Sequence, residues 1–219
     1  MDRDRLSQLV TLINQALRPN LELKSIRPHD PVQVTDLPSP WLLLGTGNYA
    51  AVFTHPDYPD QAIKIYAPNR PGFEEEVEVY RRLGDHPAFS CCFYAESGML
   101  ILRRLRGITL FNCLHQRRRI PVQVIADIDR ALTDAITRGL SPRDIHGKNV
   151  MMHEGRGFVV DISDFLRPGM GSAWGDFKLF YYWIYRPLLS PARVPVPLIL
   201  LEASRVSYRW LRRLLRRIA

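Results

Sequence analysis

The chain is poor in cysteine and has no long uninterrupted apolar run, and these absences exclude several classes of protein. Its three cysteines, Cys91, Cys92 and Cys113, match neither a zinc-ligand spacing nor the disulfide framework of a small secreted domain. No apolar stretch approaches the ~20 residues of a transmembrane helix, and the charged N-terminus lacks the apolar core of a signal peptide. Internal repeats are not evident. We therefore expect a single cytoplasmic globular domain.

Lysine is also scarce, although the chain is strongly basic. Four of its thirty basic residues are lysines, which leaves twenty-six arginines, and the net charge is +8. This charge favours ATP, phosphorylated or other anionic partners, and nucleic acid, by long-range attraction. However, no signature of a nucleic-acid-binding fold accompanies the charge, so no specific nucleic-acid partner is predicted.

A glycine-rich loop lies between two expected strands over residues 42–52. Glycine lets backbone amides approach phosphate oxygens without a Cβ in the way. A dinucleotide-binding loop would open into a helix, whereas a hairpin follows here, so the context excludes that kind of site. An ordinary glycine-rich hairpin is the alternative for this loop taken alone. The pattern G-x-G-x-x-A-x-V is formed by Gly45, Gly47, Ala50 and Val52.

One of the four lysines, Lys64, stands in the β-branched run that begins at Ala62 and follows the glycine loop. Its ammonium would bind the α- and β-phosphates of ATP and be oriented by a glutamate from the next helix. Within the glutamate cluster that opens this helix, Glu76 shares a face with the apolar residues at i+4 and i+7. Glu76 is therefore the predicted partner, with Glu75 and Glu78 as alternatives. The simpler alternative for the lysine is a solvated side chain on an edge strand.

Two stretches further along the chain together predict a phosphoryl-transfer site. Asp144 precedes Asn149 by five residues, and Asp161 directly follows an apolar strand. The first carboxylate can accept a hydroxyl proton, while the amide and the second carboxylate hold magnesium on ATP phosphates. Asp164 is a second candidate for the metal, but a carboxylate at a strand end is held more rigidly than one three residues into a loop. Lys148 is expected to stabilise charge on the γ-phosphate, with a solvated loop lysine as the alternative.

In this order, the motifs between about residues 41 and 186 resemble the small, atypical eukaryotic-type serine/threonine protein kinase-like family of bacteria. The resemblance implies an α+β, two-lobed fold with a reduced C-terminal lobe, and ATP in the cleft between the lobes. The chain then divides into three parts: residues 1–40, an N-lobe (41–106) and a short C-lobe (107–219). Within the first part, apolar periodicity predicts an amphipathic helix over residues 2–17, and the proline content predicts an extended connector after it. The C-lobe ends in a basic helix.

The same resemblance assigns a hinge for adenine. Leu102 stands at the gatekeeper position, and backbone groups around Arg103 and Leu105 would bind the base, with Ala62 and Lys64 completing the nucleotide site. Two arginines in a hinge depart from the usual pattern, but adenine is bound mainly by the backbone.

Other departures concern the acceptor. His146 stands where serine/threonine kinases carry lysine, and Asp-x-His-x-x-Asn is also found in aminoglycoside and choline kinase-like enzymes. The segment 167–176, which follows Asp161, leaves no room for a long activation loop, and much of the usual C-lobe is reduced. Asp176 would either anchor the catalytic loop or serve as an ordinary acid at a helix N-terminus.

We therefore expect an ATP- and Mg²⁺-dependent phosphotransferase, foremost a protein serine/threonine kinase acting on a hydroxyl. A small-molecule kinase of the aminoglycoside, choline or sugar type and a nucleotide-binding pseudokinase scaffold are the alternatives. The arginine-rich amphipathic segment 203–219 either packs on its own domain or contacts an anionic membrane surface or acidic partner. The expected localisation is cytoplasmic, with peripheral membrane association as the alternative.

Overall fold

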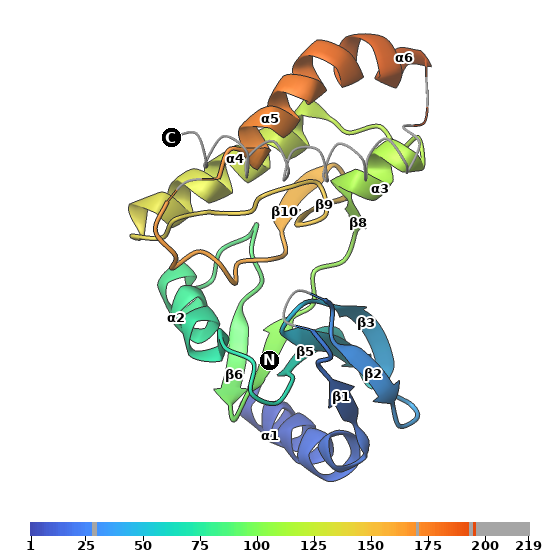
Figure 1. Ribbon diagram of the computed structural model, residues 1–219, viewed down its shortest axis with the longest axis vertical. Coiled ribbons are helices and arrows are strands. Elements are labelled where there is room, and N and C mark those ends of the chain that lie inside the picture. The colour runs from blue at the N-terminus through green and yellow to red at the C-terminus, as the bar shows by residue number, and fades with distance from the viewer. Residues whose placement is uncertain (28–29, 170, 193–194, 196–219) are drawn as a thin grey trace. The chain divides into compact units, whose positions relative to one another are not determined.

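The computed structural model describes residues 1–27, 30–169, 171–192 and 195 (Figure 1). The chain forms two compact units. The first contains residues 1–106, 131–143 and 162–169, and the second contains residues 107–130, 144–161 and the described residues from 171 onward. The first boundary follows Arg106, where the sequence predicts the end of the N-lobe; the lobes as functional domains stay a prediction. In the described part of the chain, no helix has the length and apolar character needed to cross a bilayer.

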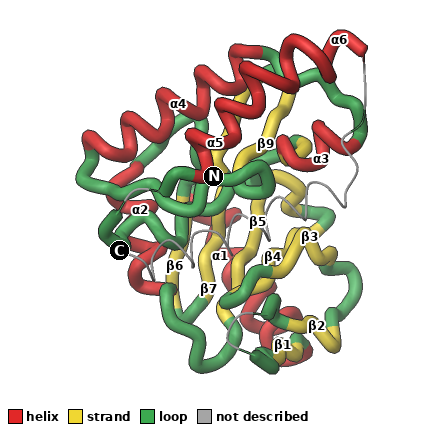
Figure 2. The backbone as a smooth tube through the Cα atoms, turned by 45° about the horizontal axis from the view of Figure 1, so that its top comes forward, coloured by secondary structure: helices red, strands yellow, loops and turns green. Residues whose placement is uncertain are grey.

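The first unit is built on an antiparallel five-stranded sheet with the strand order β3-β4-β5-β7-β6 (Figure 2). The hairpin predicted around the glycine loop is present, and a turn after His55 leads into the next strand. Pairing places Lys64 of β5 between Val52 of β4 and Leu100 of β7. The strands are β3 (Leu42–Thr46), β4 (Ala50–His55), β5 (Tyr58–Tyr66), β6 (Cys92–Glu96) and β7 (Met99–Arg103).

The N-terminal helix α1 (Arg3–Leu12) and the π-helical segment Ile13–Leu17 complete the core of this unit. The carboxylate of Asp2 caps α1 by accepting the Arg5 N–H at 2.8 Å. Apolar residues four apart form one stripe on the helix. This stripe is fully buried against Phe53 and Ile63 of the sheet, so the amphipathic helix predicted for residues 2–17 is confirmed. The buried stripe residues are Leu9, Ile13 and Leu17.

The proline-rich connector after this helix is not wholly extended. It contains a 3₁₀ turn (Arg18–Asn20) and the antiparallel hairpin of β1 (Glu22–Lys24) and β2 (Gln33–Asp36). Proline lacks the N–H that a strand ladder needs. Consistently, Pro31 and Pro38 fall outside both strands. The proline content of this stretch predicted an extended connector in the sequence analysis. The hairpin was missed because the prolines lie outside the paired residues.

Helix α2 (Phe73–Leu83) follows β5 in the first unit. Three glutamates in its first turn complement the helix dipole, and Arg81 and Arg82 do so in the last turn. The helix ends at Gly84, whose φ of 60° is a left-handed value that glycine adopts without strain.

The second unit contains the three-stranded sheet β10-β9-β8 and most of the remaining helices. A Cβ added at Gly157 of β10 would lie 2.4 Å from the Val124 carbonyl oxygen, so only glycine allows the strand to approach α4 so closely. The elements are β8 (Ile108–Thr109), α3 (Leu110–His115), α4 (Val122–Thr137), β9 (Val150–His153), β10 (Arg156–Val159), α5 (Ala173–Phe180), a π-helical segment (Tyr181–Leu189) and α6 (Ser190–Ala192). Residues 131–137 of α4 belong to the first unit.

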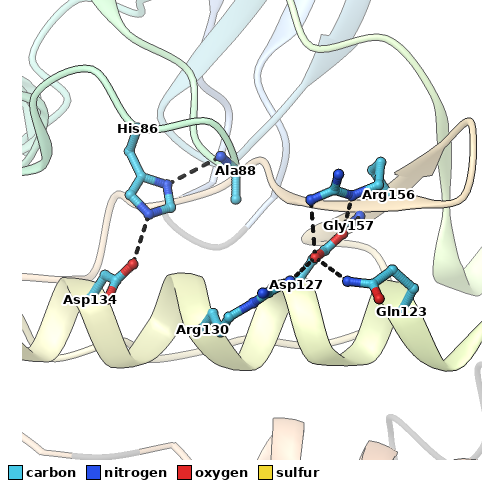
Figure 3. Close-up of polar contacts among 8 residues, drawn as sticks. All are labelled: His86, Ala88, Gln123, Asp127, Arg130, Asp134, Arg156 and Gly157. Atoms are coloured by element: carbon cyan, nitrogen blue, oxygen red, sulfur yellow. Dashed lines mark hydrogen bonds and ion pairs between the residues drawn. The ribbon is translucent and has the colours of Figure 1, made fainter.

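A buried carboxylate on α4 connects the helix to β10 (Figure 3). The Asp127 side chain is 5% exposed and accepts hydrogen bonds from Arg156 Nε at 2.7 Å, Gly157 N–H at 3.1 Å and Gln123 Nε2 at 2.8 Å. Burial alone would raise the pKa of Asp127, but these bonds, that of Arg156 foremost, outweigh it and hold the pKa well below its ordinary value.

Further along α4, Asp134 lies opposite a nearly buried histidine (Figure 3). His86 Nδ1 accepts the Ala88 N–H at 3.1 Å, which leaves the proton on Nε2, 3.1 Å from Asp134 Oδ2. The contact ties the loop after α2 to the C-terminal part of α4 within the first unit.

Candidate active site

The first unit holds a buried ion pair between strand and helix. Lys64 Nζ lies 2.8 Å and 2.6 Å from the two carboxylate oxygens of Glu76, whose side chain is 2% exposed. The hydroxyl of Tyr66 also contacts Glu76 Oε2. The predicted pair is thus present, and its carboxylate has a third polar neighbour that the sequence did not indicate.

The choice among the glutamates follows from the helical face. Glu76 is buried together with Tyr80 and Leu83 at i+4 and i+7, as the periodicity predicts. Glu75 is exposed, and Glu78 pairs instead with the guanidinium groups that follow it on α2. The alternatives for the partner of the lysine are therefore excluded by geometry.

The glycine loop joins β3 to β4 in the same unit. Gly47 N–H donates to the Ala50 carbonyl oxygen at 2.8 Å, and Gly47 O accepts the Val32 N–H at 2.9 Å. A Cβ at Gly45 would meet no atom within 4 Å, and one at Gly47 only a carbonyl oxygen at 3.8 Å. Packing within the chain therefore does not require glycine at either position, which leaves room on this loop for a ligand.

The expected hinge follows β7. Leu102 is 6% exposed and pairs with Ala62 of β5. Arg103 is engaged by its own chain, since its N–H donates to Cys91 O at 2.9 Å and its carbonyl oxygen accepts the Ser90 hydroxyl at 2.6 Å. Leu105, in contrast, is a half-buried residue whose backbone N–H has no hydrogen-bond partner among the described residues. Leu105 is thus the better-placed of the two backbone donors.

The arginines of the hinge have structural roles of their own. The Arg103 guanidinium donates to the carbonyl oxygens of His86 and Phe89 at 2.9 and 2.6 Å, and Arg106 pairs with Asp60 at 2.8 Å. These contacts hold both arginine side chains against their own unit.

The predicted catalytic loop lies in the second unit. Asp144 has a left-handed backbone with φ of 53° and a side chain that is 64% exposed. Asn149 Nδ2 donates to the Asp144 carbonyl oxygen at 3.0 Å, which closes the loop on itself. His146 Nδ1 accepts the Lys148 N–H at 3.3 Å, so its other nitrogen faces Asp144 Oδ2, 3.7 Å away. A non-glycine residue in this conformation is strained, and such strain is concentrated at functional sites.

An aromatic side chain supports this loop from the start of α3. Phe111 N–H donates to the Gly147 carbonyl oxygen at 2.8 Å, and Lys148 Nζ lies 4.4 Å from the centroid of the Phe111 ring. The ring face attracts the ammonium, which limits where the lysine can reach. Phe111 was missed by sequence reasoning because nothing in the motif spacing connects α3 with residues 146–149.

The two metal candidates lie in the same unit as this loop. The side-chain nitrogen of Asn149 donates to the Asp144 carbonyl oxygen, which leaves Asn149 Oδ1 as the side-chain atom that could bind a metal. Val160 N–H, next to Asp161 in the chain, donates to the Asn149 carbonyl oxygen at 3.0 Å. No cluster of three His, Cys, Asp or Glu side chains suited to a metal occurs among the described residues. The donors present are an amide and a carboxylate oxygen. This set fits Mg²⁺, which takes few protein ligands and completes its shell with phosphates and water.

Two other aspartates considered in the sequence analysis, Asp164 and Asp176, have different surroundings. Asp164 belongs to the first unit and pairs with Arg167 at 3.2 Å. Asp176 is exposed in the first turn of α5, as expected for an ordinary acid at a helix N-terminus. Trp174 Nε1 and Lys178 Nζ of the same helix donate instead to Asp129, at 2.7 and 2.8 Å.

The expected site residues therefore form two groups, one in each unit. The first unit holds the glycine loop, the hinge and the Lys64–Glu76 pair, and the second holds Asp144, Lys148, Asn149 and Asp161. The basic segment 203–219, considered as a contact with membrane or an acidic partner, lies outside the described residues.

The chain is similar to proteins that are named as kinases. It is 27% identical over 156 residues to a Bacillus subtilis protein named as a putative serine/threonine-protein kinase, YrzF, and the match covers 70% of this chain and 73% of that protein. Among solved structures it is similar to the Mycobacterium tuberculosis PknI kinase domain, at 25% identity and a TM-score of 0.42, and to a mutant of that domain, at 26% and 0.43. Both matches cover 58% of this chain and 59% of the PknI domain. No protein-family model matches the sequence.

Proposed function

We propose that this chain, which has an α+β protein kinase-like fold, is a protein kinase that transfers the γ-phosphate of ATP to a hydroxyl group of a protein. The observation that carries the proposal is the Lys64–Glu76 pair, with Nζ to carboxylate distances of 2.8 and 2.6 Å on the strand after the glycine loop. An ammonium held by a buried carboxylate is oriented for the α- and β-phosphates. The similarity to a bacterial protein named as a serine/threonine kinase supports the same reaction.

Nucleotide binding is assigned to the first unit. The backbone of the loop with Gly45 and Gly47 approaches the phosphates, and Ala50, Val52 and Ala62 line the site beside Lys64. The Leu105 backbone N–H binds adenine, with Leu102 next to it. This N–H suits the role because it has no hydrogen-bond partner among the residues that the structure describes. The backbone of Arg103 can contribute less, because its N–H already donates to Cys91 O and its carbonyl oxygen already accepts the Ser90 hydroxyl. One lone pair of that oxygen is left for adenine.

The transfer step is assigned to the second unit. Asp144 orients the acceptor hydroxyl and takes its proton as the oxygen attacks the γ-phosphorus and ADP departs. Lys148 stabilises the charge on the transferred group. Asn149 and Asp161 would hold Mg²⁺, which supplies neutralisation of the phosphate charge when bound. The oxygen donors and the oriented Asn149 amide support this choice of metal.

A protein acceptor is preferred over a small molecule. His146 leaves the motif compatible with small-molecule kinases. However, the bacterial relative is named as a serine/threonine-protein kinase, and the match covers 73% of its length. Because the chain is basic, an anionic partner is favoured, including a contact of segment 203–219 with acidic protein or anionic lipid.

The decisive experiment compares Asp144→Asn with His146→Ala in an assay with γ-labelled ATP and cell extract. Losing a positioned acid–base group costs ~10²–10⁴-fold in rate. We expect Asp144→Asn to lose turnover by about that factor while nucleotide binding persists, and His146→Ala to lose less. Near wild-type transfer in Asp144→Asn would refute the role of this loop, and label on a metabolite instead of protein would select the small-molecule alternative.

The metal assignment has its own control. Asp161→Ala should remove most magnesium-dependent nucleotide binding, while Asp164→Ala, three residues on and paired with Arg167, should retain it. Nucleotide titrations with and without Mg²⁺ measure both. The opposite ranking of the two variants would assign the metal to Asp164.

A further inference from the structure

The second unit contains a pocket of about 900 Å³ that the proposed reaction does not use. It lies between the turn that connects α3 to α4 and the helical segment that follows α5. No residue assigned to nucleotide, metal or proton transfer lines it. Three consecutive arginines, Arg117, Arg118 and Arg119, stand on the turn, and Arg186 stands on the helix. These four residues define the arginine pocket.

Buried tyrosines hold the walls of the arginine pocket together. Tyr181 Oη donates to the Ile120 carbonyl oxygen at 2.9 Å, and Tyr185 Oη donates to Arg118 O and accepts the Ile120 N–H, both at 3.1 Å. The two rings stack with centroids 5.5 Å apart. Burial raises the pKa of Tyr181 to about 12, so its hydroxyl stays a donor at neutral pH. The turn is therefore fixed before any ligand arrives.

The charge of the arginine pocket is not neutralised within the described part of the chain. Each of the four arginines is exposed, and no acidic side chain there lies within ion-pair distance of their guanidinium groups. Arg130 is a contrast, since it pairs with Asp127 at 2.5 Å. The C-terminal residues 196–219 carry six arginines and a single acid, Glu202, so this segment lacks the complementary charge. An anion from another molecule is the expected occupant.

The lining favours a peptide over an isolated anion. Leu114, Ile120 and Leu189 place apolar side chains beside the guanidinium groups. A volume of about 900 Å³ is at the upper end of the range for ligand pockets and far exceeds that of one phosphate. Guanidinium forks bind carboxylates in a bidentate manner, and the apolar wall takes a neighbouring aliphatic residue.

We infer that the arginine pocket binds an acidic peptide segment of the protein acceptor. The inference rests on the proposed protein kinase function and names a substrate class for it. Docking at a pocket separate from the transfer residues raises the local concentration of the hydroxyl without changing the chemical step.

Fluorescence anisotropy with a labelled decapeptide of Glu, Asp and Leu, without hydroxyl residues, tests the inference on the full chain. The double variant Arg119→Ala/Arg186→Ala should weaken binding about tenfold, since it removes two charged contacts. The matched control, Arg3→Ala/Arg27→Ala, loses the same charge from exposed positions of the first unit and should bind as the wild type does. A Lys/Leu decapeptide should not bind.

Equal weakening in the control variant would overturn the inference, because attraction would then depend on net charge alone. Binding of inorganic phosphate or of phosphatidylserine vesicles with the same arginine dependence, without peptide binding, would overturn it as well. The assay needs no catalysis, so peptide binding without any phosphate transfer would refute the proposed function while retaining the pocket. With the acidic segment fused to a serine peptide, the double variant should raise KM about tenfold and leave kcat unchanged.

Discussion

Replacing Glu76 by alanine tests the central ion pair through stability, independently of any substrate. The side chains of Glu76 and Lys64 are 2% and 17% exposed, so the variant leaves a largely buried ammonium without its carboxylate. Removing one partner of a buried pair costs about 3–5 kcal/mol, and the residual exposure of Lys64 favours the lower end. For a chain of this size, ~3 kcal/mol corresponds to a Tm lowered by about 6–12 °C. If the pair were exposed, it would contribute only ~0–1 kcal/mol.

A double-mutant cycle separates the pair from general damage to the helix. Lys64→Met combined with Glu76→Leu removes both charges, and burying apolar side chains of similar size is often neutral or stabilising. The double variant should therefore be less destabilised than the sum of the two single variants. Glu75→Ala is the matched control because it removes an exposed glutamate from the same turn of α2 and should change stability by less than about 0.5 kcal/mol.

Thermal and urea unfolding followed by circular dichroism measure the wild type, the two single variants and the double variant of the cycle, Glu76→Ala and Glu75→Ala. If Glu76→Ala unfolds at the same temperature as Glu75→Ala, the burial argument is wrong. Strict additivity in the cycle would mean that Lys64 and Glu76 do not interact in solution, and the orientation of the lysine would then need another cause.

Four further predictions concern other parts of the chain. Gly47→Ala should keep wild-type Tm, since a Cβ there meets only an oxygen at 3.8 Å, yet weaken ATP binding in a titration; unchanged affinity would remove the loop from the nucleotide site. Gly157→Ala should lower Tm because its Cβ would lie 2.4 Å from a carbonyl oxygen, and an unaltered Tm would contradict the packing of β10. The lowered pKa of Asp127 stabilises the fold above the ordinary value of ~3.9 and loses this effect as pH falls below it. The urea-unfolding difference between wild type and Asp127→Asn should therefore shrink from pH 7 to pH 3, and a constant difference would refute this. Partial burial of Cys92 and full burial of Cys113 raise the pKa of both thiols to about 11, so both should react slowly with iodoacetamide at pH 8; rapid labelling of either would contradict its raised pKa.

Local periodicity predicted the elements of the first unit well. The alternation around the glycine loop predicts a hairpin, and β3 and β4 form it. The spacing of Tyr80 and Leu83 from Glu76 identifies the inward glutamate because one helical face must be buried as a whole. These features depend on residues close together in the chain, where spacing alone carries the information.

Contacts between distant residues were missed for the opposite reason. Tyr66 beside Glu76, Phe111 beside Lys148 and the Asp127 contacts join segments whose separation has no characteristic spacing. The hairpin inside the proline-rich connector was missed because the prediction rested on proline content, which does not reveal which residues pair.

The amino-acid sequence by itself led to the chemistry that we propose, because the lysine, the carboxylates and the asparagine occur in a characteristic order and spacing. Tertiary structure alone decided the electrostatic environment of these groups. The sheet and α2 together bury Glu76, so that losing one partner of the pair leaves a largely buried charge without its counter-ion. The stacked tyrosines lie in the wall of the pocket that four arginines line. Burial and charge balance are sums over neighbours that only folding brings together, so they cannot be obtained from the order of residues along the chain.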